Sequence, residues 1–160
     1  MQEAYYLNKL YPFQDKVLSR INTLDLVLKI DFINDVPFHF GNFERFDFFG
    51  KVDNWRNILS NKLCALSRME PKDYADILFI AQKYSFNWED LIQEARKKDL
   101  WVEPVKISKM IKEFPAKLLN PIKWIIPPDL KLAASSFSII SEDILKGFNN
   151  SIVPDLKLKR

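Results

Sequence analysis

Glycine is scarce in this sequence: Gly41, Gly50 and Gly147 are the only three among 160 residues, and they lie far apart. Walker-type phosphate loops and dinucleotide-binding fingerprints both need clustered glycines, because the backbone must approach the phosphates closely. The scarcity of glycine therefore excludes both motifs. We expect neither NAD nor a flavin as a cofactor.

Cysteine and histidine are rarer still, with one residue of each. A single cysteine cannot form an internal disulfide and is typical of a reducing compartment. One cysteine and one histidine also exclude the usual kind of zinc site. A serine–histidine–aspartate triad would have to use His39, which follows Pro37 and precedes Gly41. We interpret His39 as a turn or packing residue.

Long apolar runs are missing as well. No run approaches the roughly 20 apolar residues that a membrane span needs. Lys9, Asp15 and Lys16 interrupt the first apolar residues, so we expect no signal peptide. These absences predict a cytoplasmic protein that does not bind a membrane.

The sequence is well supplied with apolar and aromatic residues, at 48% and 14%, while its net charge is only +3. This composition predicts a folded domain, and the small positive charge does not by itself indicate nucleic-acid binding. We predict one domain over residues 1–150. Within it, residues 1–53 form a helix and a β-hairpin, and residues 54–148 form the helical part. Residues 151–160 form a loose basic tail.

Periodicity changes along the first part of the chain. Residues 5–24 have apolar residues at helical spacing, whereas residues 26–33 alternate, as in a half-buried strand. A second strand over residues 43–49 would follow Gly41 and complete a hairpin with a long connection. Asp31 lies on the more open face of the first strand. It is either a solvated side chain or a group that binds metal or activates a hydroxyl.

The remainder of the chain is predicted to be helical, with a proline-rich connector before the last helix. Helices are expected at residues 55–67, from Pro71, from an Asn87 cap, from Pro104, and at residues 130–148 with Gly147 as the C-cap. The connector, residues 115–129, carries Trp124, Ile125 and Ile126, which we expect to be buried. The predicted fold class is α+β and mostly helical: a short antiparallel hairpin or small sheet packed on five to six helices.

Charged residues gather around one predicted helix–turn–helix, which turns at Met69. Lys62 is seven residues before the turn and Asp76 is seven after it. Each therefore lies about 10 Å along its helix from the joint, and the two should be level. Arg68 is expected near Asp73. This group is either a salt-bridge network that fixes two helices or a phosphate-handling site.

The same segment, NKLCALSRMEPKDYADI at residues 61–77, resembles the nucleotidyltransferase-type toxins of the AbiEii/AbiGii family. Residues 11–18, 28–37 and 86–99 are similar to the flanking segments of such proteins. The resemblance implies a nucleotidyltransferase-like fold and Mg²⁺-dependent transfer of NMP from an NTP to an acceptor such as tRNA, within a toxin–antitoxin or phage-defence system.

The resemblance also implies roles for individual residues. Lys62 would contact the triphosphate, with Arg68 beside it as a second substrate-binding residue. Asp76 and Asp73 would match the acidic residues of the family's second helix. Asp31 would match the third strand carboxylate, a ligand of Mg²⁺.

The family's first motif is missing from this sequence. That motif consists of a Gly-Gly-Thr/Ser turn and a later Asp-x-Asp pair, and neither Gly-Gly nor Asp-x-Asp occurs here. We therefore expect a shortened fold, whether by nature or by engineering, with little or no activity from this chain alone.

Two other functions stay open. The helical half could be a non-enzymatic interaction module that binds an antitoxin or a homologue, or forms a homo-oligomer through the edge of the hairpin. An RNA-binding module without chemistry would rest on the mild positive charge.

Overall fold

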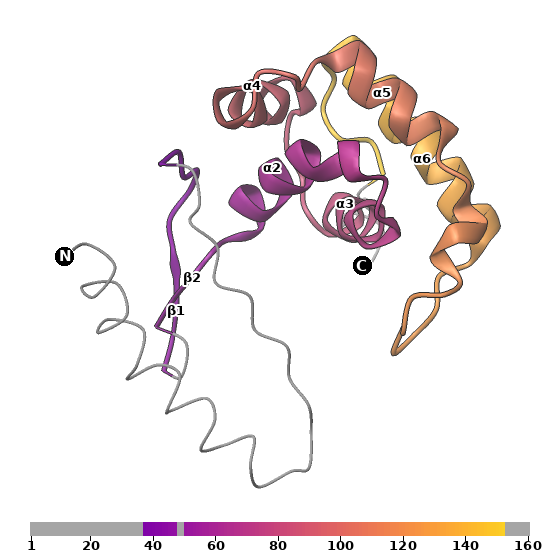
Figure 1. The fold of residues 1–160 in the computed structure, drawn as a ribbon, viewed down its shortest axis with the longest axis horizontal. Coiled ribbons are helices and arrows are strands. Elements are labelled where there is room, and N and C mark those ends of the chain that lie inside the picture. The colour runs from indigo at the N-terminus through magenta and orange to yellow at the C-terminus, as the bar shows by residue number, and fades with distance from the viewer. Residues whose placement is uncertain (1–36, 48–49, 153–160) are drawn as a thin grey trace, which may run out of the picture. The chain divides into compact units, whose positions relative to one another are not determined.

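The computed structural model describes residues 37–47 and 50–152, all of which fall within one compact unit of the chain, residues 36–160 (Figure 1). The helix predicted at residues 5–24, the strand predicted at residues 26–33 and Asp31 lie outside the described residues. The single domain over residues 1–150 therefore stays a prediction.

A short antiparallel hairpin opens the described part. Strand β1 (Glu44–Phe46) pairs with β2 (Gly50–Val52), with Arg45 opposite Lys51. The predicted single strand over residues 43–49 is therefore wrong, because the chain reverses within it. Gly50 explains the difference: its φ of +74° is one that glycine adopts without strain, and it begins the returning strand.

Five α-helices and two short 3₁₀ helices follow among the described residues. They are α2 (Trp55–Ala65), η1 (Leu66–Arg68), α3 (Pro71–Lys83), α4 (Trp88–Lys98), α5 (Pro104–Glu113), η2 (Ala116–Leu119) and α6 (Leu130–Lys146). Together with the two-stranded sheet they confirm the predicted α+β, mostly helical fold. No helix within the described ranges is long and apolar enough to cross a bilayer.

Local signals set most helix ends. The side chain of Asn54 caps α2, and Asn87 caps α4, each accepting from backbone N–H groups of the first turn. Pro71 and Pro104 begin α3 and α5, where a missing N–H costs nothing. Gly147 ends α6 in the left-handed conformation. These boundaries agree with the sequence predictions.

Two packed groups of helices share one core. Helix α2 packs against α3 and α4, while α5 packs along α6 (Figure 1). An aromatic cluster joins the groups: the ring of Tyr74 stacks on Phe114 at 3.9 Å, and Phe137 meets Phe114 edge-on at 5.5 Å. Because these rings come from α3, the end of α5 and α6, the core holds the α2–α3 pair in a fixed orientation.

The proline-rich connector departs from its prediction. The indole N–H of Trp124 donates to the carbonyl of Leu119 at 2.8 Å, and the ring is half-buried against the core. Ile125, by contrast, is fully exposed, and Ile126 is nearly so. The expectation that all three would be buried is wrong for the two isoleucines, because the connector contacts the core through Leu119, Ile122 and Trp124, and no described element covers Ile125 and Ile126.

Candidate functional site

The turn between α2 and α3 is tight and well defined. After η1, Met69 takes a left-handed conformation (φ 56°), and its N–H donates to the carbonyl of Leu66 at 3.0 Å. The hydroxyl of Tyr74 donates to the sulfur of Met69 at 3.2 Å and holds the turn against α3. Pro71 then starts α3. This geometry brings the last turn of α2 beside the first turns of α3.

The structure brings four of the predicted site residues together. Lys62 Nζ lies 3.0 Å from an oxygen of Asp73 and 2.7 Å from an oxygen of Asp76. Arg68 Nη2 lies 2.9 Å from the other oxygen of Asp73. The predicted proximity of Lys62 to Asp76 and of Arg68 to Asp73 is confirmed. We call these four residues the Lys62 cluster.

The members of the Lys62 cluster differ greatly in exposure. Asp73 is 4% exposed and Lys62 is 27% exposed, whereas Asp76 and Arg68 are 47% and 62% exposed. Asp73 is thus a buried anion that is bound by two cations. A buried carboxylate is stable only when it is paired and hydrogen-bonded in this way. Asp76 is a more open partner that solvent reaches.

The aspartates hold Lys62 in its charged form. Burial by itself would lower the pKa of Lys62, but hydrogen bonds to Asp76 and Asp73, and the charges of both, outweigh burial and raise its pKa above the ordinary value. The neighbouring Tyr74 also has a raised pKa, first because it is buried and second because of the charge of Asp73. Both groups keep their protons at neutral pH.

The cluster is electrically neutral, because two cations face two anions. Both aspartates are already engaged, so a phosphate could contact Lys62 only in competition with the exposed Asp76. Within the described ranges, no group of three histidine, cysteine, aspartate or glutamate residues could hold a metal ion. The described residues therefore do not fit a Mg²⁺ site, and the predicted ligand Asp31 lies outside them.

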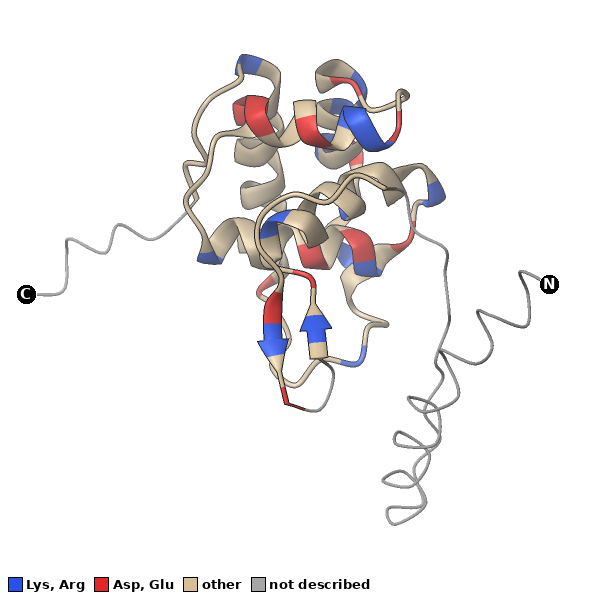
Figure 2. Cartoon of the chain, turned by 90° about the vertical axis from the view of Figure 1, so that its left-hand side faces the viewer, with Lys and Arg blue, Asp and Glu red and all other residues tan. Residues whose placement is uncertain are grey.

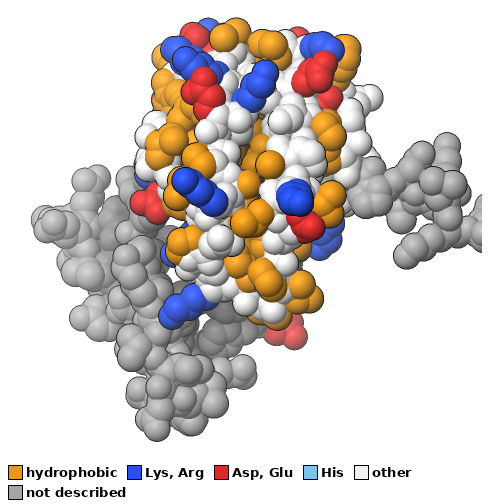
Figure 3. Space-filling view, turned by 90° about the vertical axis from the view of Figure 1, so that its right-hand side faces the viewer, with side chains coloured by type: hydrophobic (Ala, Val, Ile, Leu, Met, Phe, Trp, Pro, Cys, Tyr) orange, Lys and Arg blue, Asp and Glu red, His pale blue; other side chains and the backbone are white. Residues whose placement is uncertain are grey.

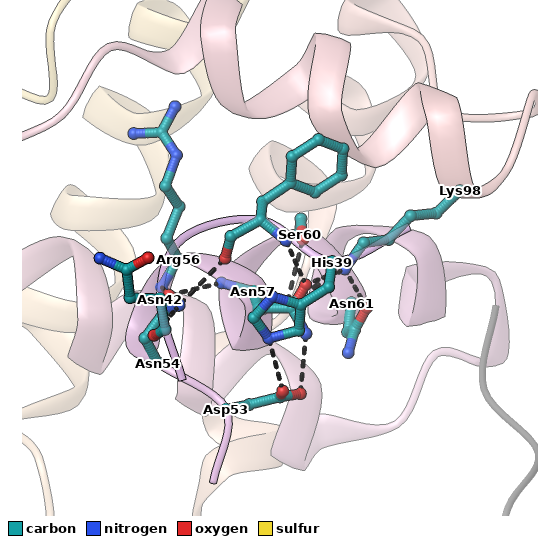
Figure 4. A network of polar contacts seen from close by, with 10 residues as sticks. His39, Asn42, Asp53, Asn54, Arg56, Asn57, Ser60, Asn61 and Lys98 are labelled. Atoms are coloured by element: carbon teal, nitrogen blue, oxygen red, sulfur yellow. Dashed lines mark hydrogen bonds and ion pairs between the residues drawn. The ribbon is translucent and has the colours of Figure 1, made fainter. Parts of the chain in front are cut away.

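Sequence reasoning missed a second polar network, shown in Figure 4. Its centre is Asn57, which donates to Asp53 at 2.7 Å and accepts from Lys98 at 2.6 Å. Lys98 also donates to Asn61 at 2.6 Å. The spacing of Asn54, Asn57 and Asn61 places three amides on one face of α2, but it does not show that Lys98 is their partner.

This network holds the loop that precedes β1. His39 Nε2 lies 2.9 Å from Asp53, and its ring stacks on Phe43 with centroids 3.8 Å apart. Asn57 accepts from the backbone N–H of Phe40 at 3.1 Å. His39 thus anchors a loop, in agreement with its interpretation as a turn or packing residue.

Arg56 ties α2 to α4 beside this network. Its Nε donates to both carboxylate oxygens of Glu94, at 2.9 and 3.0 Å, and its Nη2 donates to one of them at 2.7 Å. Such a bidentate pair fixes orientation as well as distance. The polar groups on this side of α2 thus hold structure in place, which leaves the Lys62 cluster as the candidate site.

Comparisons with protein-family models, with curated proteins and with solved structures give no match for this chain.

Proposed function

We propose that this chain is a relative of the AbiEii/AbiGii nucleotidyltransferase-type toxins in which Lys62 contacts the triphosphate of a bound NTP. The supporting observation is the placement of Lys62: a half-buried, charged lysine held at 3.0 Å and 2.7 Å by two aspartates on the neighbouring helix. Asp73 fixes the ammonium from the buried side. Asp76 contacts it from the open side, where a phosphate could compete.

The reaction that the resemblance implies is Mg²⁺-dependent transfer of NMP from an NTP to an RNA acceptor such as tRNA, as part of toxin–antitoxin or phage defence. The sequence has neither the Gly-Gly turn nor the Asp-x-Asp pair of that family. Phosphoryl chemistry needs positioned groups that neutralise the developing charge. We therefore propose that the chain alone binds an NTP weakly and transfers little or no NMP.

Isothermal titration calorimetry with ATP, GTP, CTP and UTP tests the binding step, with Lys62→Gln against the matched control Lys72→Gln, an exposed lysine of α3. A charge-assisted contact to phosphate is worth about 1.5–3 kcal/mol, so Lys62→Gln should weaken binding by about tenfold or more. Lys72→Gln should have little effect. Equal losses in the two variants, or no NTP binding at all, would contradict the proposal.

A transfer assay tests the chemistry. The full chain is incubated with labelled NTPs, Mg²⁺ and total tRNA, and transferred label is measured. We expect none above background. Robust transfer that is lost in Lys62→Gln would show that the chain carries a complete site despite the missing motif.

A specific observation favours a second candidate, the non-enzymatic interaction module. Exposed apolar side chains occur on the α5–α6 face, where Figure 3 shows them among basic ones. They include Val105, Leu132, Ile139 and Leu145, and the exposed pair Ile125 and Ile126 extends the set. Apolar surface of this kind is typical of a protein contact with a homologue or an antitoxin.

Light scattering across a concentration series tests this candidate. Self-association that is abolished by Leu132→Ser with Leu145→Ser, in a chain that binds no NTP, would favour the interaction module. A monomer that binds NTP through Lys62 would favour the first proposal. Self-association that persists in the double variant would favour the exposed strands of the hairpin as the contact.

A further inference from the structure

A cavity of about 310 Å³ opens between the hairpin, the start of α2 and α3. Three aromatic residues line it, Trp55, Phe79 and Tyr84. Three carboxylates line it as well, those of Glu44, Asp53 and Asp76. No lysine, arginine or histidine lines it. Figure 2 shows acidic stretches of the hairpin and of the helices on this side of the molecule, with basic stretches between them.

The aromatic wall is preformed. The rings of Trp55 and Tyr84 stack with centroids 4.6 Å apart and an interplanar angle of 10°. Phe79 lines the cavity and is 60% exposed. The exposed ring of Phe79, beside this rigid stack, offers a flat π face to a ligand at little cost in conformational entropy.

The chain itself shows that these rings attract a cation. The ammonium of Lys83 lies 5.2 Å from the centroid of Tyr84 and 5.9 Å from that of Phe79. Both distances are within the range of cation–π attraction. Lys83 is not among the residues that line the cavity.

Three carboxylates lie around the rings, and Glu44 is the one that takes part in no ion pair with another described residue. They come from separate elements: Glu44 from β1, Asp53 from the residues between β2 and α2, and Asp76 from α3. Asp53 also binds His39, and Asp76 also binds Lys62, so both are held in position. Carboxylate oxygens beside aromatic faces match a guanidinium, which stacks on rings and forms bidentate contacts.

We propose that this cavity receives an arginine side chain from a basic segment of a protein partner. Nucleic acid fits poorly, because its phosphates would face three carboxylates. This docking site is distinct from NTP binding at Lys62, although Asp76 borders both. Binding of a basic segment should survive Lys62→Gln, so failure of one proposal can be told from failure of the other.

The probe is the peptide acetyl-Gly-Arg-Gly-Arg-Gly-amide, titrated into the ¹⁵N-labelled full chain at low salt and followed by NMR. We expect saturable shifts at the indole N–H of Trp55 and the amide of Phe79. The same peptide with citrulline in place of arginine keeps the shape without the charge, and should not bind. Glu44→Gln and Phe79→Ser should each weaken binding by about two- to fivefold.

Matched controls make the outcome decisive. Glu113→Gln and Phe148→Ser change an exposed carboxylate and an exposed ring away from the cavity and should leave affinity unchanged. Equal binding of the citrulline peptide, equal losses in the control variants, or shifts that avoid Trp55 and Phe79 would overturn the proposal. Tighter binding of spermidine than of the peptide would overturn the assignment to a protein segment.

Discussion

Asp73 is the residue on which the Lys62 cluster depends. It is nearly inaccessible to solvent, and its two oxygens accept from Lys62 and Arg68, one each. Asp76 shares Lys62 but stands half in solvent. Ion pairs of similar length can therefore differ in how much they contribute to stability, because solvent screens an exposed pair more than a buried one.

Neutralising Asp73 should therefore cost more stability than neutralising Asp76. We expect Asp73→Asn to lower the free energy of unfolding by about 1–3 kcal/mol, since charge-assisted contacts to a buried group are lost. Asp76→Asn should cost less than about 1 kcal/mol. Urea unfolding followed by tryptophan fluorescence measures both. Equal losses would show that burial of Asp73 does not strengthen its pairs.

The raised pKa values of Lys62 and Tyr74 predict a loss of stability in alkali. Folding raises both values, so the folded chain binds these protons more tightly than the unfolded chain. The resulting stability is complete below the unfolded pKa values, about 10 for both groups, and falls as pH rises through the folded values. Urea midpoints between about pH 9 and pH 11 should decline in the native sequence.

The decline should be shallower in Lys62→Gln and in Tyr74→Phe, because each variant lacks one of the titrating groups. Lys72→Gln serves as the control and should follow the native curve. If neither Lys62→Gln nor Tyr74→Phe changed the slope, other groups would be responsible for the loss of stability in alkali.

At the scale of the element, the loop before β1 shows how a short segment without secondary structure is fixed. The side-chain amide of Asn54 donates to the carbonyls of Phe40 and Asn42, at 3.0 and 2.7 Å, while its oxygen caps α2. One asparagine thus starts a helix and holds a loop. Gly41 lies directly against that amide and has a φ of +80°.

Substitution of Gly41 should disturb both functions of Asn54. A Cβ at this position would lie 2.5 Å from Nδ2 of Asn54, whereas a Cβ at Gly50, which also has positive φ, would meet nothing within 4 Å. Gly50→Ala should cost about 1–2 kcal/mol for the left-handed backbone alone. Gly41→Ala should have the same backbone cost and should also lose the cap contacts of Asn54, which lowers the free energy of unfolding by a further 0.5–2 kcal/mol, roughly. Thermal unfolding of both variants measures the difference. Equal losses of stability would show that a Cβ at position 41 does not crowd Asn54.

For the described unit as a whole, the residues after α6 return to the other helices. The side-chain amide of Asn150 donates to the carbonyls of Ala81 and Tyr84, at 2.6 and 2.9 Å, and its backbone N–H donates to Phe86 at 2.8 Å. These contacts join segments more than sixty residues apart. They hold the end of α6 against the junction of α3 and α4.

Loss of the Asn150 side chain should weaken the contact between the end of α6 and the junction of α3 and α4. Asn150→Ala leaves two carbonyls without their donor in a buried place, at a cost of about 1–3 kcal/mol. The neighbouring Asn149 is exposed and its side chain accepts one surface hydrogen bond, from Asn87, so Asn149→Ala should cost less, under about 1 kcal/mol. Urea unfolding with hydrogen exchange of the α3 and α4 amides tests the pair. Unchanged hydrogen exchange in Asn150→Ala would show that the contacts of Asn150 do not stabilise α3 and α4.

Most helices of the described part could be predicted because their signals are local. Asn54, Asn87 and Gly147 act on the turn next to them, and the apolar stripes repeat within each helix. The Lys62 cluster was predictable for the same reason, since Lys62 and Asp76 are seven residues on either side of one tight turn.

The sequence predicted a hairpin but not the two strands, Glu44–Phe46 and Gly50–Val52, that form the one observed. Residues 43–49 follow Gly41 and are rich in phenylalanine, which suits one strand, but these features do not show where the chain reverses. The exposure of Ile125 was also beyond the sequence. Apolar character predicts burial in general, but whether another element covers a given loop depends on the packing of the whole unit.

The sequence by itself determined the helices, their caps, the tight turn at Met69, the proximity of Lys62 to Asp76 and that of Arg68 to Asp73, because these follow from contacts within about two turns of helix. Only the tertiary structure decided which carboxylate of the cluster is buried, how Lys98 reaches Asn57 across 41 residues, and how Glu44 and Asp76 come to line one cavity. These features depend on packing between distant segments, for which residue spacing carries no signal.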